Sequence, residues 1–508
     1  MRHMPPATIT KKPRTCLPDL ALLLLYLGVR IRRLLLFPVF IDEAFHLRWA
    51  RDVWSLHPLG GVPDGKALGP WVIALLYPFE NGLWLARLSA ILVGMVGLAA
   101  LLSLGRRWLG ARVSWAAGLL YVLLPYTFFF ERLALADPLA ASLGIIAAWL
   151  IALAARSPRR WYAVLAGLAL AAAILAKLPM AVFLALPVAA WALVLAPGER
   201  RRAWLSIGAI YAVCLLLLAV VVGVSLPRVG VFGLGNAQRF TSVKAGTLPA
   251  RVWGNARLFF EWVPVYVGWP ILILSGVGVG VSLVRRERRA VYLAAAAALP
   301  TLEFWAVSTY PVPRYYLLST GVALLLASYG AWQLLDLARC ASPVGTWLEP
   351  VAGAAALIAI SAPMVGFVLT AYSAPAALKL AEPDARDAIW HSTSGFGLAE
   401  GAAWLEQETG TAQGITVVCS AAVTCDRLEA YLYGTPGLEF ARADVVSPEW
   451  VAAQDALGRS AMLAEDDPPH GRPFAPPAGC RVERLQQFVR PGGLSTFTLY
   501  QIACQSAG

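Results

Sequence analysis

The chain has 508 residues, of which 59% are hydrophobic and 14% are charged, and its mean hydropathy is +0.64. Apolar stretches long enough to cross a bilayer recur along most of it, which excludes a soluble globular protein and predicts an integral membrane protein. Of 42 Lys and Arg and 30 Asp and Glu, residues 1–372 hold 33 and 14, so residues 373–508 hold the remaining 9 and 16. Because basic residues among membrane spans follow the positive-inside rule, the net charge of +12 does not indicate nucleic-acid binding.

A basic stretch that contains Arg2 and Arg14 precedes the first apolar run. It has the charge of a signal-peptide n-region, but no small-residue cleavage site follows it. We therefore expect a cytoplasmic tail and a first span over about residues 20–36. Three arginines near the outer end of this span can reach the interface with their side chains: Arg30, Arg32 and Arg33.

Later basic clusters are expected to lie in the cytoplasm, at residues 106–112, 156–160, 200–202 and 285–289. The apolar segments between them form pairs that turn on the outer side. These segments lie at about residues 83–105, 112–130, 138–155, 161–177, 180–196, 203–226, 264–284, 290–307, 316–338 and 348–372. With the first span they give roughly eleven crossings, and an odd number that starts in the cytoplasm ends outside it.

The tail, residues 373–508, is therefore predicted to be a small extracytoplasmic α/β domain. A helix is expected over residues 398–408 and a strand over residues 415–418. Four of the seven cysteines lie in this tail and can pair in an oxidising compartment: Cys419, Cys425, Cys480 and Cys504. Three connectivities and free thiols are all open. Pairing of the first two and of the last two is favoured, because the last two bracket strand-like runs at residues 481–489 and 494–502.

Charged residues inside apolar segments cost about 2.5 to 3.5 kcal/mol each on insertion scales, so their positions are informative. The first outer loop carries Asp42, Glu43 and His46 at the start of a segment with apolar residues at helical spacing, and continues to Asp64 and Lys66. The segment is predicted to be a helix in the membrane interface. Capping and the helix dipole are a purely structural alternative for the acidic pair.

Ionisable residues recur at three later outer turns, which have almost no loop to hold them in water. They are Glu131, Arg132 and Asp137, then Lys177, then Arg314 followed by Tyr315. Each alone could be a snorkelling residue or a structural ion pair. Together with the first loop, they predict one polar site at the outer membrane face. Its carboxylates can act as a base, and its cations can hold an anion such as phosphate.

The sequence lacks the signatures of several other enzyme classes. It contains no Walker A sequence, no Gly-x-Gly-x-x-Gly opening a helix after a strand, no Gly-x-Ser-x-Gly and no His-Glu-x-x-His. An enzyme site that faces outward has no ATP or nucleotide sugar within reach. The activated substrate is therefore expected to arrive in the membrane, as a lipid-linked phosphate.

The order of these motifs resembles the GT-C glycosyltransferases. The motifs are Asp42-Glu43, Lys66 before a helix that enters the membrane, Arg132-x4-Asp137-Pro138, Ala176-Lys177 and Pro313-Arg314-Tyr315. Over roughly residues 18–340 the chain is similar to the group of protein O-mannosyltransferases and bacterial transferases that add aminoarabinose to lipid A. The resemblance implies an all-α polytopic membrane domain of about 11 to 13 transmembrane helices with interfacial helices in the first outer loop, followed by the small C-terminal α/β domain.

The resemblance also implies an activity: inverting transfer of one sugar from a polyprenyl-phosphate sugar donor to an acceptor hydroxyl on the outer side of the plasma (inner) membrane. Asp42 would be the general base, and Glu43 would position the acceptor or support Asp42. The donor phosphate would be bound by Lys66, Arg314 and Lys177. The sugar or acceptor would be positioned by Asp137, Arg132, Glu131, His46 and Tyr315. The sugar, and whether the acceptor is a glycan, a lipid or a protein, stay open.

The chain departs from the family pattern at two lysines. Ala67-Leu68 follows Lys66 where the family usually has two prolines, and Leu178 follows Lys177 where it has glycine. The outer loop at about residues 227–262 is too short for the sugar-binding-like repeats of eukaryotic protein mannosyltransferases. Its polar residues are expected to form either a solvated loop or a mobile lid over the site: Asn236, Gln238, Arg239, Lys244, Arg257 and Glu261.

No cofactor is certain from the sequence. A divalent metal is an open alternative, because Asp42 and His46 are four residues apart and would share a helix face. Two rival functions are also open. A secondary transporter or lipid flippase is expected to place charges near the midplane on broken helices and to show inverted repeats, and the sequence shows neither. A non-catalytic scaffold would leave the charges at the outer turns unexplained.

Overall fold

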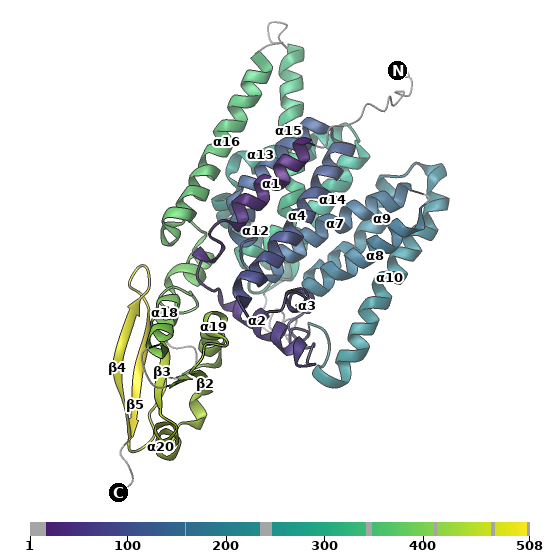
Figure 1. Cartoon of the computed structure of the whole chain (residues 1–508). Coiled ribbons are helices and arrows are strands. Elements are labelled where there is room, and N and C mark those ends of the chain that lie inside the picture. Colours follow the sequence, from purple (N-terminus) through teal and green to yellow (C-terminus); the bar gives the residue numbers. More distant parts are fainter. Residues whose placement is uncertain are drawn as a thin grey trace.

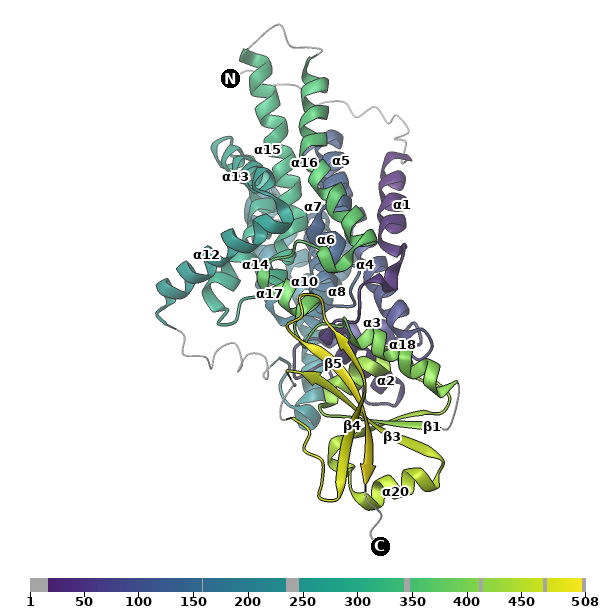
Figure 2. The same cartoon turned by 90° about the vertical axis from the view of Figure 1, so that its left-hand side faces the viewer.

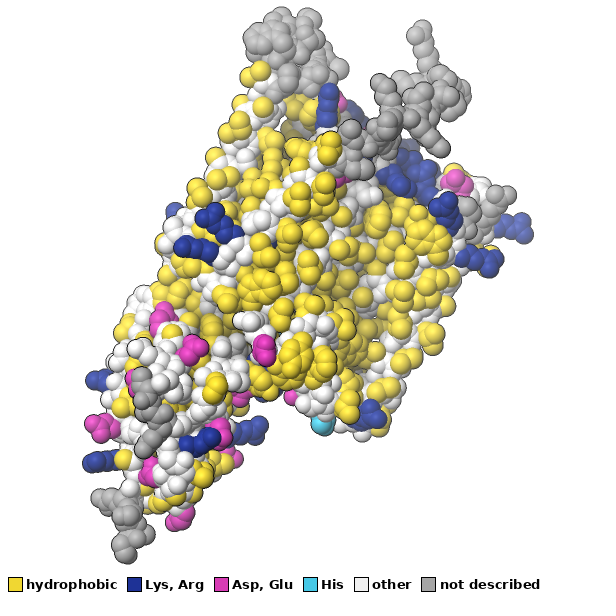
Figure 3. Space-filling model, viewed as in Figure 1, with side chains coloured by type: hydrophobic (Ala, Val, Ile, Leu, Met, Phe, Trp, Pro, Cys, Tyr) yellow, Lys and Arg dark blue, Asp and Glu magenta, His cyan; other side chains and the backbone are white. Residues whose placement is uncertain are grey.

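The computed structural model describes residues 17–157, 159–233, 246–341, 348–410, 414–468 and 473–504. A bundle of long apolar helices is joined at one end to a small α/β domain that contains the C-terminal strands (Figure 1). Hydrophobic side chains cover most of the bundle on the face drawn in Figure 3, whereas charged side chains gather over the α/β domain and at the opposite end. This distribution is that of a multi-pass membrane protein.

Six helices of the described residues are long and apolar enough to cross a membrane. They are α4 (Gly82–Trp108), α7 (Ala136–Arg156) and α14 (Arg288–Val307), parts of α10 (Pro197–Val229) and α16 (Leu348–Ser373), and Pro313–Ala338, which includes most of α15 (Leu317–Ala341). A seventh is counted if α12 (Leu248–Val267) and α13 (Trp269–Val284) form one bent span. Shorter apolar helices accompany them: α1 (Leu17–Ile31), α5 (Ala111–Leu123), α8 (Arg160–Ala176) and α9 (Leu186–Leu193). These helices support a multi-pass protein without establishing the expected count of crossings.

Three of the segments predicted as continuous are broken, and glycine or proline explains each break. The segment at 264–284 bends by 112° between α12 and α13, where Gly268 has a φ of 79° and a proline opens α13. The segment at 112–130 divides at Leu124, because Pro125 starts the separate helix α6 (Pro125–Phe130). The segment at 180–196 runs as the 3-10 helix η2 (Leu178–Ala185) before α9, and each has a proline in its first turn.

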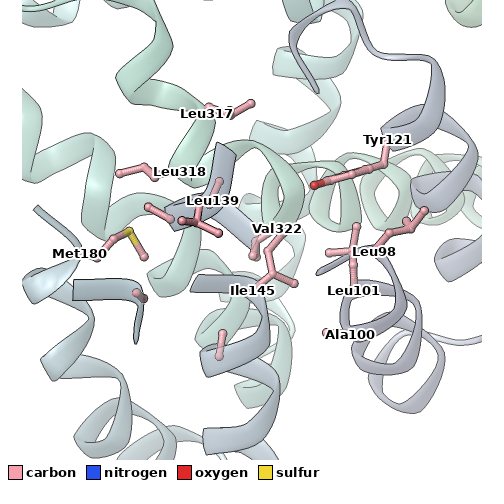
Figure 4. Packing of buried hydrophobic residues seen from close by; sticks show 14 of the residues in the cluster. Leu98, Ala100, Leu101, Tyr121, Leu139, Ile145, Met180, Leu317, Leu318 and Val322 are labelled. Carbon is pink, nitrogen blue, oxygen red and sulfur yellow. The ribbon is translucent and has the colours of Figure 1, made fainter. Parts of the chain in front are cut away.

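The core of the bundle is apolar and closely packed. Leu101 of α4, Ile145 of α7 and Val322 of α15 lie close together in Figure 4 and belong to one buried cluster. Gly97 allows α4 to approach α7, because a Cβ at this position would lie 2.9 Å from the Ser142 Cβ. This packing holds the helix ends from which the polar turns project.

The tail contains a five-stranded sheet in the order β2-β1-β3-β5-β4. β2 (Leu438–Arg442), β1 (Gly414–Cys419) and β3 (Arg459–Asp467) are parallel, whereas β5 (Thr496–Cys504) and β4 (Cys480–Val489) are antiparallel to their neighbours. The sheet is accompanied by α18 (Leu398–Thr409), α19 (Ala422–Leu432) and α20 (Pro448–Ala456) (Figure 1). The predicted small α/β fold is confirmed, and disulfides join Cys419 to Cys425 and Cys480 to Cys504, the favoured pairing.

The tail packs directly on α2 (Ile41–Trp54), the predicted interfacial helix (Figures 1 and 2). Ala44 and Leu47 of α2 share one hydrophobic cluster with Leu428 and Phe497 of the tail. Just before α2, the Val39 N–H donates a hydrogen bond to the Tyr431 hydroxyl at 2.6 Å. The helix that carries the first acidic pair is therefore held between the bundle and the tail.

Candidate active site

A cavity of about 440 Å³ lies beside the start of α2. It is bounded by residues that are far apart in the sequence, from the first loop, the start of α7, the turn after α8, the end of α14 and the 3-10 helix η3 (Pro313–Tyr316). Its polar wall is formed by Asp42, Asp64, Lys66, Asp137, Lys177, Glu303, Ser308, Arg314 and Tyr315. Its apolar wall is formed by Leu178, Pro179, Ala181, Val182, Phe304 and Val307.

Asp42 lies in the first turn of α2 and faces two cations. Its carboxylate is 3.2 Å from an Arg314 nitrogen and 3.7 Å from the Lys66 Nζ, and its side chain is 18% exposed. Burial raises the pKa of Asp42, but the charges of Lys66 and Arg314 outweigh this effect and hold the pKa well below its usual value. Asp42 is thus ionised at neutral pH.

Glu43, the next residue, faces away from the cavity. It is fully buried and pairs with the Arg87 guanidinium at 2.7 Å. Its oxygens also accept hydrogen bonds from the backbone N–H groups of Phe40 at 2.9 Å and Ala134 at 2.7 Å. Glu43 therefore lies outside the cavity, and its oxygens are bound by groups of the protein itself. It fixes the start of α2 and so orients Asp42.

Lys66 reaches the cavity from a loop that is tied to the Lys177 turn. The Gly65 carbonyl accepts a hydrogen bond from the Leu178 N–H at 3.2 Å, and the Lys66 N–H donates to the Gly61 carbonyl at 3.0 Å. Gly65 has a φ of 69°, and a Cβ there would lie 3.1 Å from the Leu178 Cβ. Only glycine meets both conditions without strain, so the loop brings two lysines to one wall.

Asp137 and Lys177 form the second ion pair of the cavity. Asp137 lies in the first turn of α7, where the helix dipole favours a carboxylate. Lys177 follows the last residue of α8, and its ammonium hydrogen-bonds Asp137. The ammonium also lies 3.8 Å from the centre of the Tyr315 ring, a cation–π contact.

Arg314 joins the two ion pairs. Its guanidinium contacts Asp42 at 3.2 Å and lies 3.7 Å from an Asp137 oxygen. Two of its buried nitrogens, Nε and Nη1, have no hydrogen-bond partner among the described residues. Because unpaired buried donors are costly, these N–H groups are available to the oxygens of an anionic ligand.

Glu131 and Arg132 lie outside the cavity, contrary to their expected role of positioning a sugar or acceptor. Glu131 pairs with the buried Arg30 at 3.3 Å and accepts a hydrogen bond from the Tyr121 hydroxyl at 2.5 Å. Arg132 donates to the backbone carbonyls of Arg32 and Arg33 at 2.9 and 2.6 Å. Both side chains anchor the end of α1 to the turn that precedes α7.

His46 is buried one turn after Asp42, and burial together with Lys66 lowers its pKa. Its Nδ1 lies 2.7 Å from the Ala134 carbonyl and donates to it, whereas Nε2 has no hydrogen-bond partner within the described ranges. No group of three or more metal-binding side chains occurs among the described residues. Because Asp42 already faces two cations, the pair does not fit a divalent ion, and we assign neither residue as a metal ligand.

The sequence did not predict a role for three carboxylates that lie in or near the site. Asp64 and Glu303 line the cavity, and Asp384 accepts a hydrogen bond from the Tyr266 hydroxyl at 2.5 Å. The role of Glu303 could have been predicted from the sequence, because an ionisable residue inside an apolar helix indicates a functional site. Of the expected lid, Arg257 and Glu261 lie on α12, and the other residues lie outside the described ranges: Asn236, Gln238, Arg239 and Lys244.

The chain is similar to known glycosyltransferases in sequence and in fold. Residues 64–226 match the family model described as dolichyl-phosphate-mannose-protein mannosyltransferase, and no curated protein matches in sequence. The structure of ArnT from Cupriavidus metallidurans bound to undecaprenyl phosphate is 17% identical, with a TM-score of 0.57 over 96% of this chain and 98% of that one. The apo structure of the same protein is 16% identical, with a TM-score of 0.56 over 95% and 97%. The resemblance to the GT-C superfamily is thereby confirmed.

Proposed function

We propose that this protein is a membrane glycosyltransferase that moves one sugar from a polyprenyl-phosphate sugar to an acceptor hydroxyl, with inversion at the anomeric carbon. One observation carries the proposal: the Arg314 guanidinium, whose Nε and Nη1 have no hydrogen-bond partner among the described residues, lies beside the ionised Asp42 in a cavity with an apolar wall. Such a cavity suits a ligand with an anionic headgroup and an isoprenoid tail. The likeness to ArnT bound to undecaprenyl phosphate supports the same class of donor.

The donor phosphate would be held by Lys66 and Arg314. Arg314 offers Nε and Nη1 to phosphate oxygens, and Lys66 adds a charge 3.7 Å from Asp42. These groups would also stabilise the negative charge that grows on the departing lipid phosphate. Lys177 is hydrogen-bonded to Asp137 and would act mainly through its charge and by fixing Asp137.

In the reaction, the acceptor oxygen would attack the anomeric carbon from the face opposite the phosphate. The new carbon–oxygen bond forms as the bond from the anomeric carbon to the phosphate oxygen breaks, and the electron pair leaves with the lipid phosphate. Asp42 takes the acceptor's hydroxyl proton and later releases it to water. A single displacement of this kind inverts the configuration.

Donor binding would make Asp42 a better base. In the empty cavity the field of Lys66 and Arg314 holds its pKa well below the usual value. A bound phosphate adds a negative charge beside the same two cations and offsets part of that field. The proton affinity of Asp42 would therefore rise only when the donor is in place, which limits activity without substrate.

We propose that the site faces the outer side of the membrane, and the positions of the basic clusters support this. They lie at the turns between α4 and α5, α7 and α8, and α13 and α14, and at the start of α10, whereas the site is built from the other turns. By the positive-inside rule these clusters face the cytoplasm, so the cavity and the tail face outward. Acceptors there would be glycans, lipids or proteins of the cell envelope.

The Asp42→Asn variant tests the proposed chemistry. It should retain binding of the polyprenyl-phosphate sugar and lose at least about 100-fold in sugar transfer, because only the base is removed. Asp52→Asn, the same change at the other end of α2, should leave transfer unchanged. The measurement is single-turnover transfer from radiolabelled donor in nanodiscs. Full turnover in Asp42→Asn would refute the role of Asp42, and donor movement across the bilayer without transfer would favour a flippase.

A further inference from the structure

One carboxylate of the cavity takes no part in the chemistry proposed above. Glu303 lies in the last two turns of α14 and lines the same cavity as Asp42 and Arg314. Its Oε2 atom is closed to solvent and has no hydrogen-bond partner in the described part of the chain. A buried carboxylate oxygen without a partner costs free energy, so a ligand that donates the missing hydrogen bond would be favoured.

The wall around Glu303 is apolar. Phe304 and Val307 lie next to it and one helical turn beyond it, and both line the cavity. Phe304 stacks on Tyr315 with ring centroids 5.0 Å apart, which fixes this wall. Ligand cavities place a few polar groups in an apolar lining, and those groups set orientation and specificity. Glu303 is placed as such a group on the α14 wall.

Charge decides which part of a donor would approach Glu303. Lys66 and Arg314 attract a phosphate, whereas a carboxylate oxygen of Glu303 offers no hydrogen-bond donor to phosphate oxygens. Lys177 attracts Glu303 electrostatically, but the hydrogen bond of its ammonium goes to Asp137. The phosphate is therefore expected beside Lys66 and Arg314, and the hydroxyl-bearing sugar beside Glu303.

We infer that Glu303 is a sugar-binding residue that accepts hydrogen bonds from the donor sugar and helps to select which sugar is transferred. The inference rests on the proposed function and extends it. A site built to accept a hydrogen bond discriminates strongly against an analogue that lacks the donor group. Glu303 would thus contribute to the choice of sugar, while the phosphate contacts serve every polyprenyl-phosphate donor alike.

The test compares binding of bare undecaprenyl phosphate with binding of undecaprenyl-phosphate sugars, by native mass spectrometry of purified protein. The wild type first identifies the sugar that binds more tightly than the bare lipid phosphate. Glu303→Ala should then lose about tenfold in affinity for that donor and keep its affinity for bare undecaprenyl phosphate. Glu303→Gln should lose less, because its amide oxygen still accepts. The control Glu287→Gln, directly before the first turn of α14, should match the wild type.

Retained binding of the bare lipid phosphate shows that each variant is folded. An equal loss for the bare lipid phosphate and the sugar donor would make Glu303 a structural residue and overturn the inference. Unchanged donor binding with transfer lost only at low acceptor concentration would assign Glu303 to the acceptor and also overturn it. If the wild type binds no lipid phosphate at all, the proposed function itself fails, a result that none of the other outcomes resembles.

Discussion

Two adjacent carboxylates of α2, Asp42 and Glu43, have different surroundings, so replacing each of them should affect the protein differently. Asp42 faces the cavity and two partly exposed cations, whereas Glu43 is fully buried against Arg87. The sequence predicts that both acidic residues belong to a polar site, because they stand at the start of an amphipathic helix in an outer loop. It cannot separate their roles, since the partners of Glu43 come from α4 and from the turn before α7.

Replacing Glu43 should destabilise the protein far more than replacing Asp42. Glu43→Ala leaves the buried Arg87 charge without its partner, which costs about 3 to 5 kcal/mol. Asp42→Asn keeps the size of the side chain and an oxygen that can accept hydrogen bonds, and Asp137 still faces Arg314, so this change should cost less than Glu43→Ala. Unfolding of both variants in mixed detergent micelles measures the two costs. Equal stability of Glu43→Ala and the wild type would contradict the structural role of Glu43.

The charges at the outer turns show the limit of reading a sequence residue by residue. Asp137, Lys177 and Arg314 do meet at one cavity. Glu131 also stands at an outer turn between two apolar segments. Its side chain instead forms a buried ion pair with Arg30 of α1. A charge at a helix end is visible in the sequence, whereas the direction of its side chain depends on packing between distant helices.

Short elements between the long helices build the cavity. The 3-10 helix η3 presents Arg314, and α17 (Glu382–Ala385) brings Asp384 from the segment after α16 against Tyr266 of α12. Burial raises the pKa of Asp384 to about 7, although Arg314 and the Tyr266 hydroxyl counteract it. The apolar pattern predicts most of the long helices well, but not these short elements, because only proline and tertiary contacts define them.

Asp384 should make stability depend on pH. Its pKa of about 7 in the folded chain exceeds the value of about 4 in an unfolded chain, so the folded state holds the extra proton between these values. The free energy of unfolding should therefore fall as pH rises from about 4 to 7, by at most about 1.4 kcal/mol per pH unit from this group. Asp384→Asn should remove that slope in unfolding curves recorded across this range. Parallel curves for variant and wild type would contradict the shift.

At the scale of the whole molecule, the tail and the membrane bundle share α2. Arg48 of α2 pairs with Asp426 of the tail at 2.8 Å, and the apolar face of α2 contributes to the tail's own hydrophobic cluster. The composition change near residue 373 predicts two regions, and the helix and strand patterns within the second predict its α/β class. It does not predict this joint, because the contact depends on surface shape.

The central claim is that Lys66 and Arg314 bind a polyprenyl phosphate that carries the sugar. It is tested most directly by thermal-shift and mass-spectrometric binding of undecaprenyl-phosphate mannose, glucose, arabinose and aminoarabinose to the wild type, Lys66→Ala and the exposed control Lys379→Ala. We expect one donor to stabilise the wild type and the control, and Lys66→Ala to lose about tenfold or more in affinity, because a charge-assisted phosphate contact is removed. Absence of binding of any lipid phosphate to well-folded wild-type protein would contradict the account and make transport the leading hypothesis.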